Sequence, residues 1–287
     1  MKKLKINFAS FLGLVLLILS FFAPILAPST KLNTPLAFRL INAYLIAYLA
    51  YMISFMDTRK VLALFIPLIT FTIINLVLVN GRQFPLDRTL VKEVYLNIRN
   101  FYDLISLVGI FFIIELGLNK LFGNTFTSIF GAICLVIFFY YDYSKILYSF
   151  TSLKDIFLYF AIYIMALRVR QATRISPLLY GLALILIGGE IYLIYRFKLT
   201  YGFLLTSLGL IYPILKGIKR PNEMNFEKFM IFVYTYIFPT ICLSLRAFTS
   251  AGDLISLILA SFITFFVGQA LYLFRIRLLN YILIGIN

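Results

Sequence analysis

Long apolar stretches recur along the whole chain, and they limit what it can fold into more than any other feature. A helix that crosses the hydrocarbon core of a bilayer needs about 20 mostly apolar residues. About ten stretches approach that length, and roughly nine to eleven spans fit the sequence. They lie at roughly 7–27, 35–56, 61–79, 102–118, 124–142, 154–168, 176–195, 200–216, 229–247 and 254–274.

The composition agrees with a membrane location. Hydrophobic residues make up 62% of the 287 residues and charged residues 13%, whereas soluble domains average about 45–50% and about 25%. Backbone in lipid must satisfy its own hydrogen bonds, and continuous rather than alternating apolar runs favour helices over a barrel. The sequence therefore predicts an all-α, polytopic transmembrane helix bundle over residues 1–287, a single membrane domain with no soluble domain.

The basic residues predict the orientation of this bundle. If the spans alternate from a cytoplasmic N-terminus, the greater share of the 26 Lys and Arg residues falls in cytoplasmic connections, as the positive-inside rule requires. Both termini of a multi-pass cell-membrane protein are therefore expected in the cytoplasm. We expect the basic residues behind the net charge of +15 to lie at span ends and to contact membrane lipid, rather than to bind nucleic acid.

The connection at 80–101 has a pattern of its own. After Pro85, the apolar residues Leu86, Leu90, Val94 and Ile98 recur at every fourth position, which predicts an amphipathic helix lying flat at the membrane interface. Two interpretations stay open for this segment. It is either a lid resting on lipid or a docking surface for an extracytoplasmic partner.

Polar and small residues inside the spans predict helix packing. Asn42, Asn75 and Gln269 are expected to form hydrogen bonds between helices. The stretch 35–56 carries small residues on one helical face, which predicts close packing within the molecule or, as the alternative, at a subunit interface. The small residues of this face are Ala43, Ala47, Ala50 and Ser54.

Two carboxylates, Glu115 and Glu190, lie well inside predicted spans. A charge at a helix centre costs about 2.5–3.5 kcal/mol on insertion scales, so an intramembrane carboxylate is a functional candidate. Glu190 is the stronger one, and three interpretations stay open for it: a proton- or ion-coupled role, a buried pair with Arg39 or Arg246, or a carboxyl that is neutral or reaches the interface. Glu115 lies near the end of its span, where its side chain could reach the interface.

The motifs of membrane enzymes are largely missing. The chain has no histidine, which removes bis-His haem, His-ligated metals and Ser–His catalysis, and no Asp-rich cluster to hold magnesium and a diphosphate. Tyr102-Asp103 and Gly252-Asp253 resemble in part the dyad of intramembrane aspartyl proteases. The simpler interpretation is that each Asp caps a helix N-terminus. No catalytic, cofactor-binding or metal-binding residue is therefore predicted.

The composition and loop pattern of the whole chain resemble those of a known group of membrane proteins. The chain is rich in Ile, Leu, Tyr and Phe, has no His or Trp, and has short loops flanked by Lys and Arg. In this it resembles integral membrane proteins of thermoacidophilic archaea, and among these the hydrophobic subunit that accompanies a membrane-anchored b-type cytochrome. The resemblance implies a cofactor-free scaffold in electron transport, with the haem on a partner subunit.

Two other functions remain as alternatives. The first is a secondary transporter or permease, in which Glu190 is the coupling carboxylate and the helices near Pro213 and Pro239 act as gates. The second is an intramembrane lipid enzyme or aspartyl protease.

Overall fold

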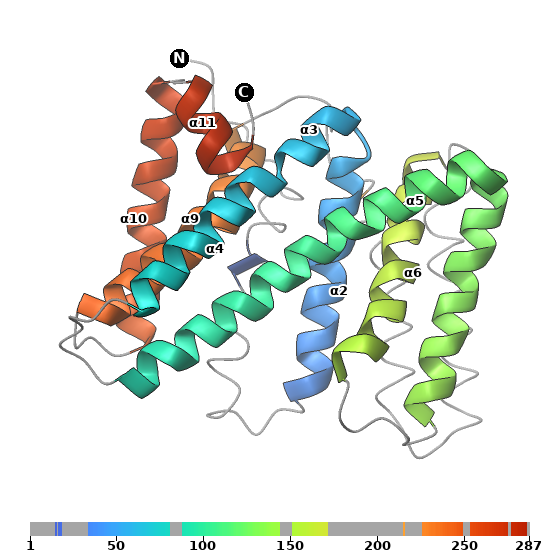
Figure 1. The fold of residues 1–287 in the computed structure, drawn as a ribbon, viewed down its shortest axis with the longest axis horizontal. Coiled ribbons are helices and arrows are strands. Elements are labelled where there is room, and N and C mark those ends of the chain that lie inside the picture. Colours follow the sequence, from blue (N-terminus) through green and yellow to red (C-terminus); the bar gives the residue numbers. More distant parts are fainter. Residues whose placement is uncertain are drawn as a thin grey trace. The chain divides into compact units, whose positions relative to one another are not determined.

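The computed structural model describes residues 15, 17–18, 34–80, 88–143, 151–171, 215, 226–248, 253–274 and 277–285. All regular elements in these ranges are α-helices, which confirms the predicted all-α class for this part of the chain (Figure 1). The predicted spans at 7–27, 176–195 and 200–216 lie largely outside the described residues, and so do Glu190 and Pro213.

Several of the described helices are long and apolar. In chain order the helices are α2 (Thr34–Ile53), α3 (Thr58–Ala63), α4 (Phe65–Asn80), α5 (Arg88–Tyr143), α6 (Thr151–Gln171), α9 (Phe226–Phe248), α10 (Asp253–Phe274) and α11 (Arg277–Ile284). Within the described ranges, 4 segments are long and apolar enough to cross a membrane, which fits a multi-pass membrane protein. The count of about ten spans stays a prediction. The 4 segments are Thr58–Asn80, Phe101–Phe138, Lys228–Leu245 and Ile255–Phe274.

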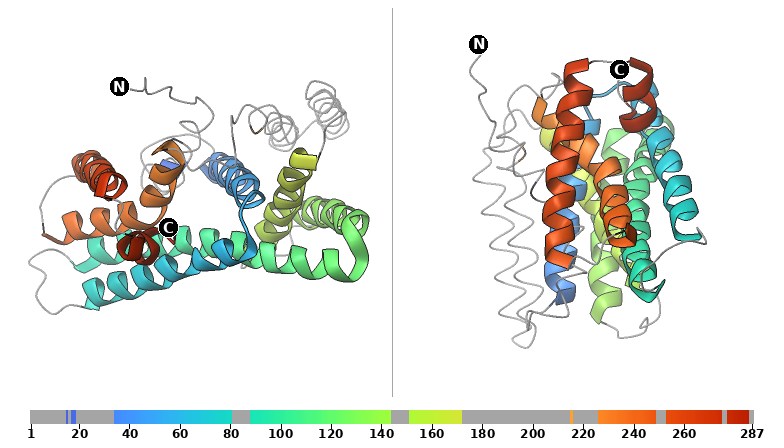
Figure 2. Two further views of the ribbon diagram at one scale, coloured as in Figure 1. Left: turned by 90° about the horizontal axis from the view of Figure 1, so that it is seen from above. Right: turned by 90° about the vertical axis from the view of Figure 1, so that its left-hand side faces the viewer.

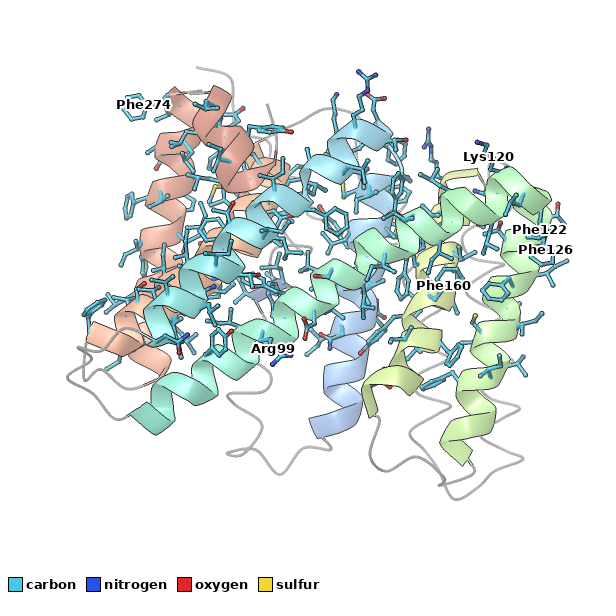
Figure 3. All side chains as sticks on the ribbon, viewed as in Figure 1. Arg99, Lys120, Phe122, Phe126, Phe160 and Phe274 are labelled. Atoms are coloured by element: carbon cyan, nitrogen blue, oxygen red, sulfur yellow. The ribbon has the colours of Figure 1, made fainter. Side chains whose placement is uncertain are left out.

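The exposed faces of these helices are apolar. On α4, Ile69, Ile73 and Val77 are each more than half exposed, and on α10 the same holds for Phe262. Figure 3 shows Phe274 projecting from the end of α10. Contiguous apolar faces of this extent are rare on soluble monomers and are typical of surfaces that meet lipid or another protein.

The chain divides into two compact units. Unit 1 comprises residues 1–31, 56–106 and 222–287, and unit 2 comprises 32–55 and 107–221. Helix α5 contributes residues to both units. The expectation of one membrane domain stays a prediction.

Helix α9 forms the centre of unit 1. In its apolar segment 78% of the residues are buried, against 28% in α10, because α9 packs against α4, α10 and α11 (Figure 2). The approach of α9 and α10 is close at Gly268, where an added Cβ would lie 2.5 Å from Met230 Sδ and 3.0 Å from Val233 Cγ1. Glycine at this position lets the two helices pack side by side.

In unit 2, helix α2 packs against α6. The small residues Ala43, Ala47 and Ala50 of α2 are fully buried, which confirms close packing within the molecule for these three, whereas Ser54 follows the end of α2 and is partly exposed. The Asn42 side chain donates a hydrogen bond of 3.4 Å to the Tyr159 hydroxyl on α6, as predicted for an interhelical contact.

Helix α5 departs from the prediction. The sequence favours a separate helix in 80–101 followed by a span that begins near 102, whereas the structure has one uninterrupted helix from Arg88 through this junction. Asp103 therefore lies inside α5, and the prediction that it caps a helix N-terminus is wrong. Asp253, by contrast, is the first residue of α10. The interfacial position of residues 88–101 stays a prediction.

Candidate functional site

Helix α5 turns sharply at Gly123 (Figure 1). The backbone of Gly123 has φ 81° and ψ 170°, a combination that residues with a Cβ rarely adopt. Two helical arms of unit 2, 107–122 and 124–143, meet at this residue without a loop. We refer to residues 115–127 as the α5 corner.

Polar side chains connect the two arms of the α5 corner. Glu115 Oε1 accepts a hydrogen bond from the Asn119 side-chain amide. The Thr127 hydroxyl donates to Asn119 Oδ1 at 2.6 Å and lies 3.1 Å from the carbonyl oxygen of Gly123. These contacts satisfy part of the backbone and side-chain hydrogen bonding that a helix break inside an apolar segment leaves open.

Helix α6 adds a basic residue to the α5 corner. The Arg168 guanidinium donates a 2.7 Å hydrogen bond to the carbonyl oxygen of Asn124, and its charge attracts that of Glu115. Glu115 is half-buried. The predicted intramembrane carboxylate therefore lies in a hydrogen-bonded network with a cationic neighbour, an arrangement that holds the corner and leaves part of the carboxylate accessible.

The other predicted site residues are not described in the same detail. Glu190 lies outside the described residues, and the side chains of Arg39 in α2 and Arg246 in α9 do too. The predicted pairing of Glu190 with either arginine therefore stays a prediction.

A second group of polar side chains lies inside unit 1. The Tyr102 hydroxyl donates a 2.8 Å hydrogen bond to the carbonyl oxygen of Tyr236. Asn75 Nδ2 lies 3.5 Å from the same Tyr102 hydroxyl, which confirms the predicted interhelical contact of Asn75. Gln269 is exposed and forms no hydrogen bond with the described residues, so its predicted interhelical contact stays a prediction.

A cavity of about 360 Å³ opens beside Tyr102 and Asn75. Helices α4 and α5 of unit 1 form its walls, with Arg99 and Asp103 among its polar residues. Its volume falls within the range of about 300–1,000 Å³ typical of small-ligand sites. Sequence reasoning missed this cavity, because Arg99 and Asp103 appear in the sequence as ordinary residues at a span end.

Metal and protease chemistry receive no support among the described residues. No group of three or more His, Cys, Asp or Glu residues there could hold a metal ion. Cys134 and Cys242 are buried and free. Asp103 lines the cavity of unit 1, whereas the side chain of Asp253 lies outside the described residues, so the aspartyl dyad stays a prediction.

In comparisons with known proteins, no family model, no curated protein and no solved structure matches this chain.

Proposed function

We propose that this protein is a cofactor-free integral membrane subunit of an electron-transport complex, in which a b-type cytochrome partner holds the haem. In this proposal about ten spans cross the membrane, and both termini lie in the cytoplasm. The segment 80–101 faces the cytochrome-like partner on the extracytoplasmic side. The chain itself acts as membrane anchor and scaffold.

The observation that supports this proposal is the combination of apolar helices with a complete lack of histidine. A b-type haem is held by protein side chains, most often by imidazoles, and this chain has no imidazole. Its described helices expose wide apolar faces, which suit contact with lipid and with the membrane anchor of another subunit. A scaffold subunit needs such faces, and it needs no side chain that coordinates haem.

Co-purification tests the proposal directly. The full chain, tagged and expressed in its native host, is extracted in a mild detergent, and reduced-minus-oxidised spectra are recorded on the purified material. We expect a haem-containing partner in a fixed ratio to the chain, and no haem on the chain expressed alone. A chain that always purifies without a redox-active partner, or that binds haem by itself, contradicts the proposal.

A second candidate is a secondary carrier, and the α5 corner is the observation that favours it. Ion-coupled carriers bind ions where apolar helices are interrupted. In this chain, Gly123 interrupts an apolar segment of 38 residues that also contains Glu115. The corner thus combines a broken helix with an accessible carboxylate, and Glu190 remains the sequence-based candidate for the coupling residue.

Proton entry into proteoliposomes tests the carrier function. The purified chain is reconstituted, and internal pH is followed while amino acids, sugars and organic acids are added in turn. A carrier is expected to admit protons with one of these solutes, and Glu190→Gln or Glu115→Gln to abolish the coupling. Uptake that is unchanged in both variants removes these carboxylates from the mechanism.

A further inference from the structure

Two opposite charges line the unit 1 cavity without pairing. Arg99 and Asp103 lie one helical turn apart on α5, and both are exposed (Figure 3 shows Arg99 projecting from the helix). Neither forms an ion pair or a hydrogen bond with another residue in the described part of the chain. At the start of α3, by contrast, Asp57 and Lys60 are also exposed and do pair, with Nζ and Oδ2 3.5 Å apart.

The opposite wall of the same cavity is apolar. Leu68, Ile69 and Ile73 of α4 contribute to it, and the last two are more than half exposed. These residues belong to a segment, Thr58–Asn80, that is long and apolar enough to span a membrane. The apolar side of the cavity therefore opens on the helix face that meets hydrocarbon.

Asn75 adds an unsatisfied polar group. Its side chain lines the cavity and is 1% exposed, yet its Oδ1 accepts no hydrogen bond from the described residues. Buried polar atoms almost always have a hydrogen-bond partner. A ligand that carries an N–H or O–H donor would supply what Asn75 lacks.

We propose that this cavity binds a membrane lipid with a zwitterionic headgroup. Arg99 contacts the phosphate, Asp103 contacts the ammonium group, and a hydrocarbon chain lies along Ile69 and Ile73. Residues four apart on a helix have Cβ atoms about 5–6 Å apart, a spacing that suits charges separated by a short linker, as in phosphoethanolamine, better than the adjacent charges of an amino acid.

The charges also argue against a purely anionic lipid. Arg99 alone would favour any phosphate, but an anionic lipid such as phosphatidylglycerol carries no cation that could pair with the carboxylate of Asp103 in the same cavity. A free zwitterion would leave the apolar wall uncovered. The proposal requires that the chain lies in a membrane, and it does not require a partner subunit.

Lipid titration with the purified full chain tests the proposal. Native mass spectrometry in a mild detergent measures binding of dioleoylphosphatidylethanolamine, dioleoylphosphatidylglycerol and water-soluble phosphoethanolamine. We expect the zwitterionic lipid to bind about tenfold more tightly than the anionic one, a difference of about 1.4 kcal/mol. Equal or tighter binding of phosphatidylglycerol overturns the proposal. Free phosphoethanolamine that competes as well as the lipid overturns the assignment to a lipid.

Matched variants locate the binding to this cavity. Arg99→Gln is expected to weaken the binding of both lipids about tenfold, because both carry a phosphate, whereas Asp103→Asn is expected to lower the preference for the zwitterionic lipid about tenfold. Arg59→Gln and Asp57→Asn make the same changes at exposed positions outside the cavity and are expected to leave both the binding and the preference unchanged. If the two cavity variants and the two control variants change lipid binding equally, the assignment of the lipid to this cavity is contradicted. If a cavity variant fails to fold, the comparison of the two lipids on the unchanged chain still tests whether the protein prefers the zwitterionic lipid.

Discussion

The Tyr102 hydroxyl of α5 donates a 2.8 Å hydrogen bond to the carbonyl oxygen of Tyr236 in α9. The hydroxyl of Tyr236 in turn donates at 2.9 Å to the carbonyl oxygen of Leu64, between α3 and α4. Both tyrosine side chains are buried. Pro239 lies in the next turn of α9, where its missing N–H and its ring disturb the helix hydrogen bonds. The two hydroxyls therefore connect the neighbouring helices of unit 1 to the proline-containing part of α9.

We expect Tyr102→Phe to destabilise the protein by about 1–2 kcal/mol, because a buried hydrogen bond is lost. Thermal unfolding in detergent measures the change. Tyr95→Phe is the control, since Tyr95 lies on the same helix and forms no hydrogen bond with the described residues. Equal losses in the two variants would mean that the contact with Tyr236 contributes nothing.

Gly123→Ala is expected to cost about 1–3 kcal/mol, because alanine is strained at the backbone angles of this corner. An added Cβ would meet no atom within 4 Å, so the loss would come from the backbone alone. Gly117→Ala is the matched control: it lies in the preceding helical arm, also with open space around it. There alanine is expected to stabilise the helix by up to about 1 kcal/mol. The same sign in both variants would contradict the strained conformation of Gly123.

Gly268→Val is expected to separate α9 from α10 and to cost roughly 1–3 kcal/mol, as overpacking in well-packed interiors does. The adjacent variant Gln269→Val places the same side chain on the exposed face of α10 and is expected to change stability by less than about 0.5 kcal/mol. Both are compared by detergent-based thermal unfolding. If Gly268→Val is as stable as the unchanged chain, the helices are not packed this closely.

Thr127→Val removes the hydroxyl that donates to Asn119 Oδ1 while nearly keeping the side-chain volume. We expect a loss of about 1 kcal/mol, because a partly buried hydrogen bond between the two arms of the α5 corner disappears. Ser128→Ala removes a hydroxyl that, among the described residues, bonds to the carbonyl oxygen of Asn124 in its own arm, and is expected to change stability much less. A ratio near one between the two losses would show that Asn119 does not link the arms through Thr127.

Hydropathy predicted the extent of several helices well. The stretches 61–79, 229–247 and 254–274 agree closely with the apolar segments at Thr58–Asn80, Lys228–Leu245 and Ile255–Phe274. Burying an apolar segment in lipid depends on length and composition, and both can be read from a sequence. The gap between 102–118 and 124–142 likewise coincides with the turn at Gly123.

The start of α5 could not be predicted in this way. Lys92 and Arg99 interrupt the apolar pattern, and hydropathy places a connection there, whereas the helical hydrogen bonding continues from Arg88 into the span. Hydropathy reports where a segment meets lipid, and a helix can extend beyond that point.

Most contacts between helices could not be predicted, because a single sequence does not show how the helices are rotated relative to one another. Asn75 was predictable as a bonding residue, because a polar amide in an apolar helix needs a partner. Its partner Tyr102, the bond from Tyr102 to Tyr236, and the cavity beside them depend on the relative rotation of α4, α5 and α9. That rotation is set by packing across the whole unit.

The turn at Gly123 also determines which face of the second arm of α5, residues 124–143, points toward α6. At Gly131 this arm approaches α6 so closely that an added Cβ would lie 3.1 Å from Ile164 Cβ. With 3.6 residues per turn, one residue inserted between Gly123 and Gly131 would rotate the rest of the arm by about 100° and carry the glycine face away from α6. A single insertion or deletion between these two glycines would therefore misalign an entire helix.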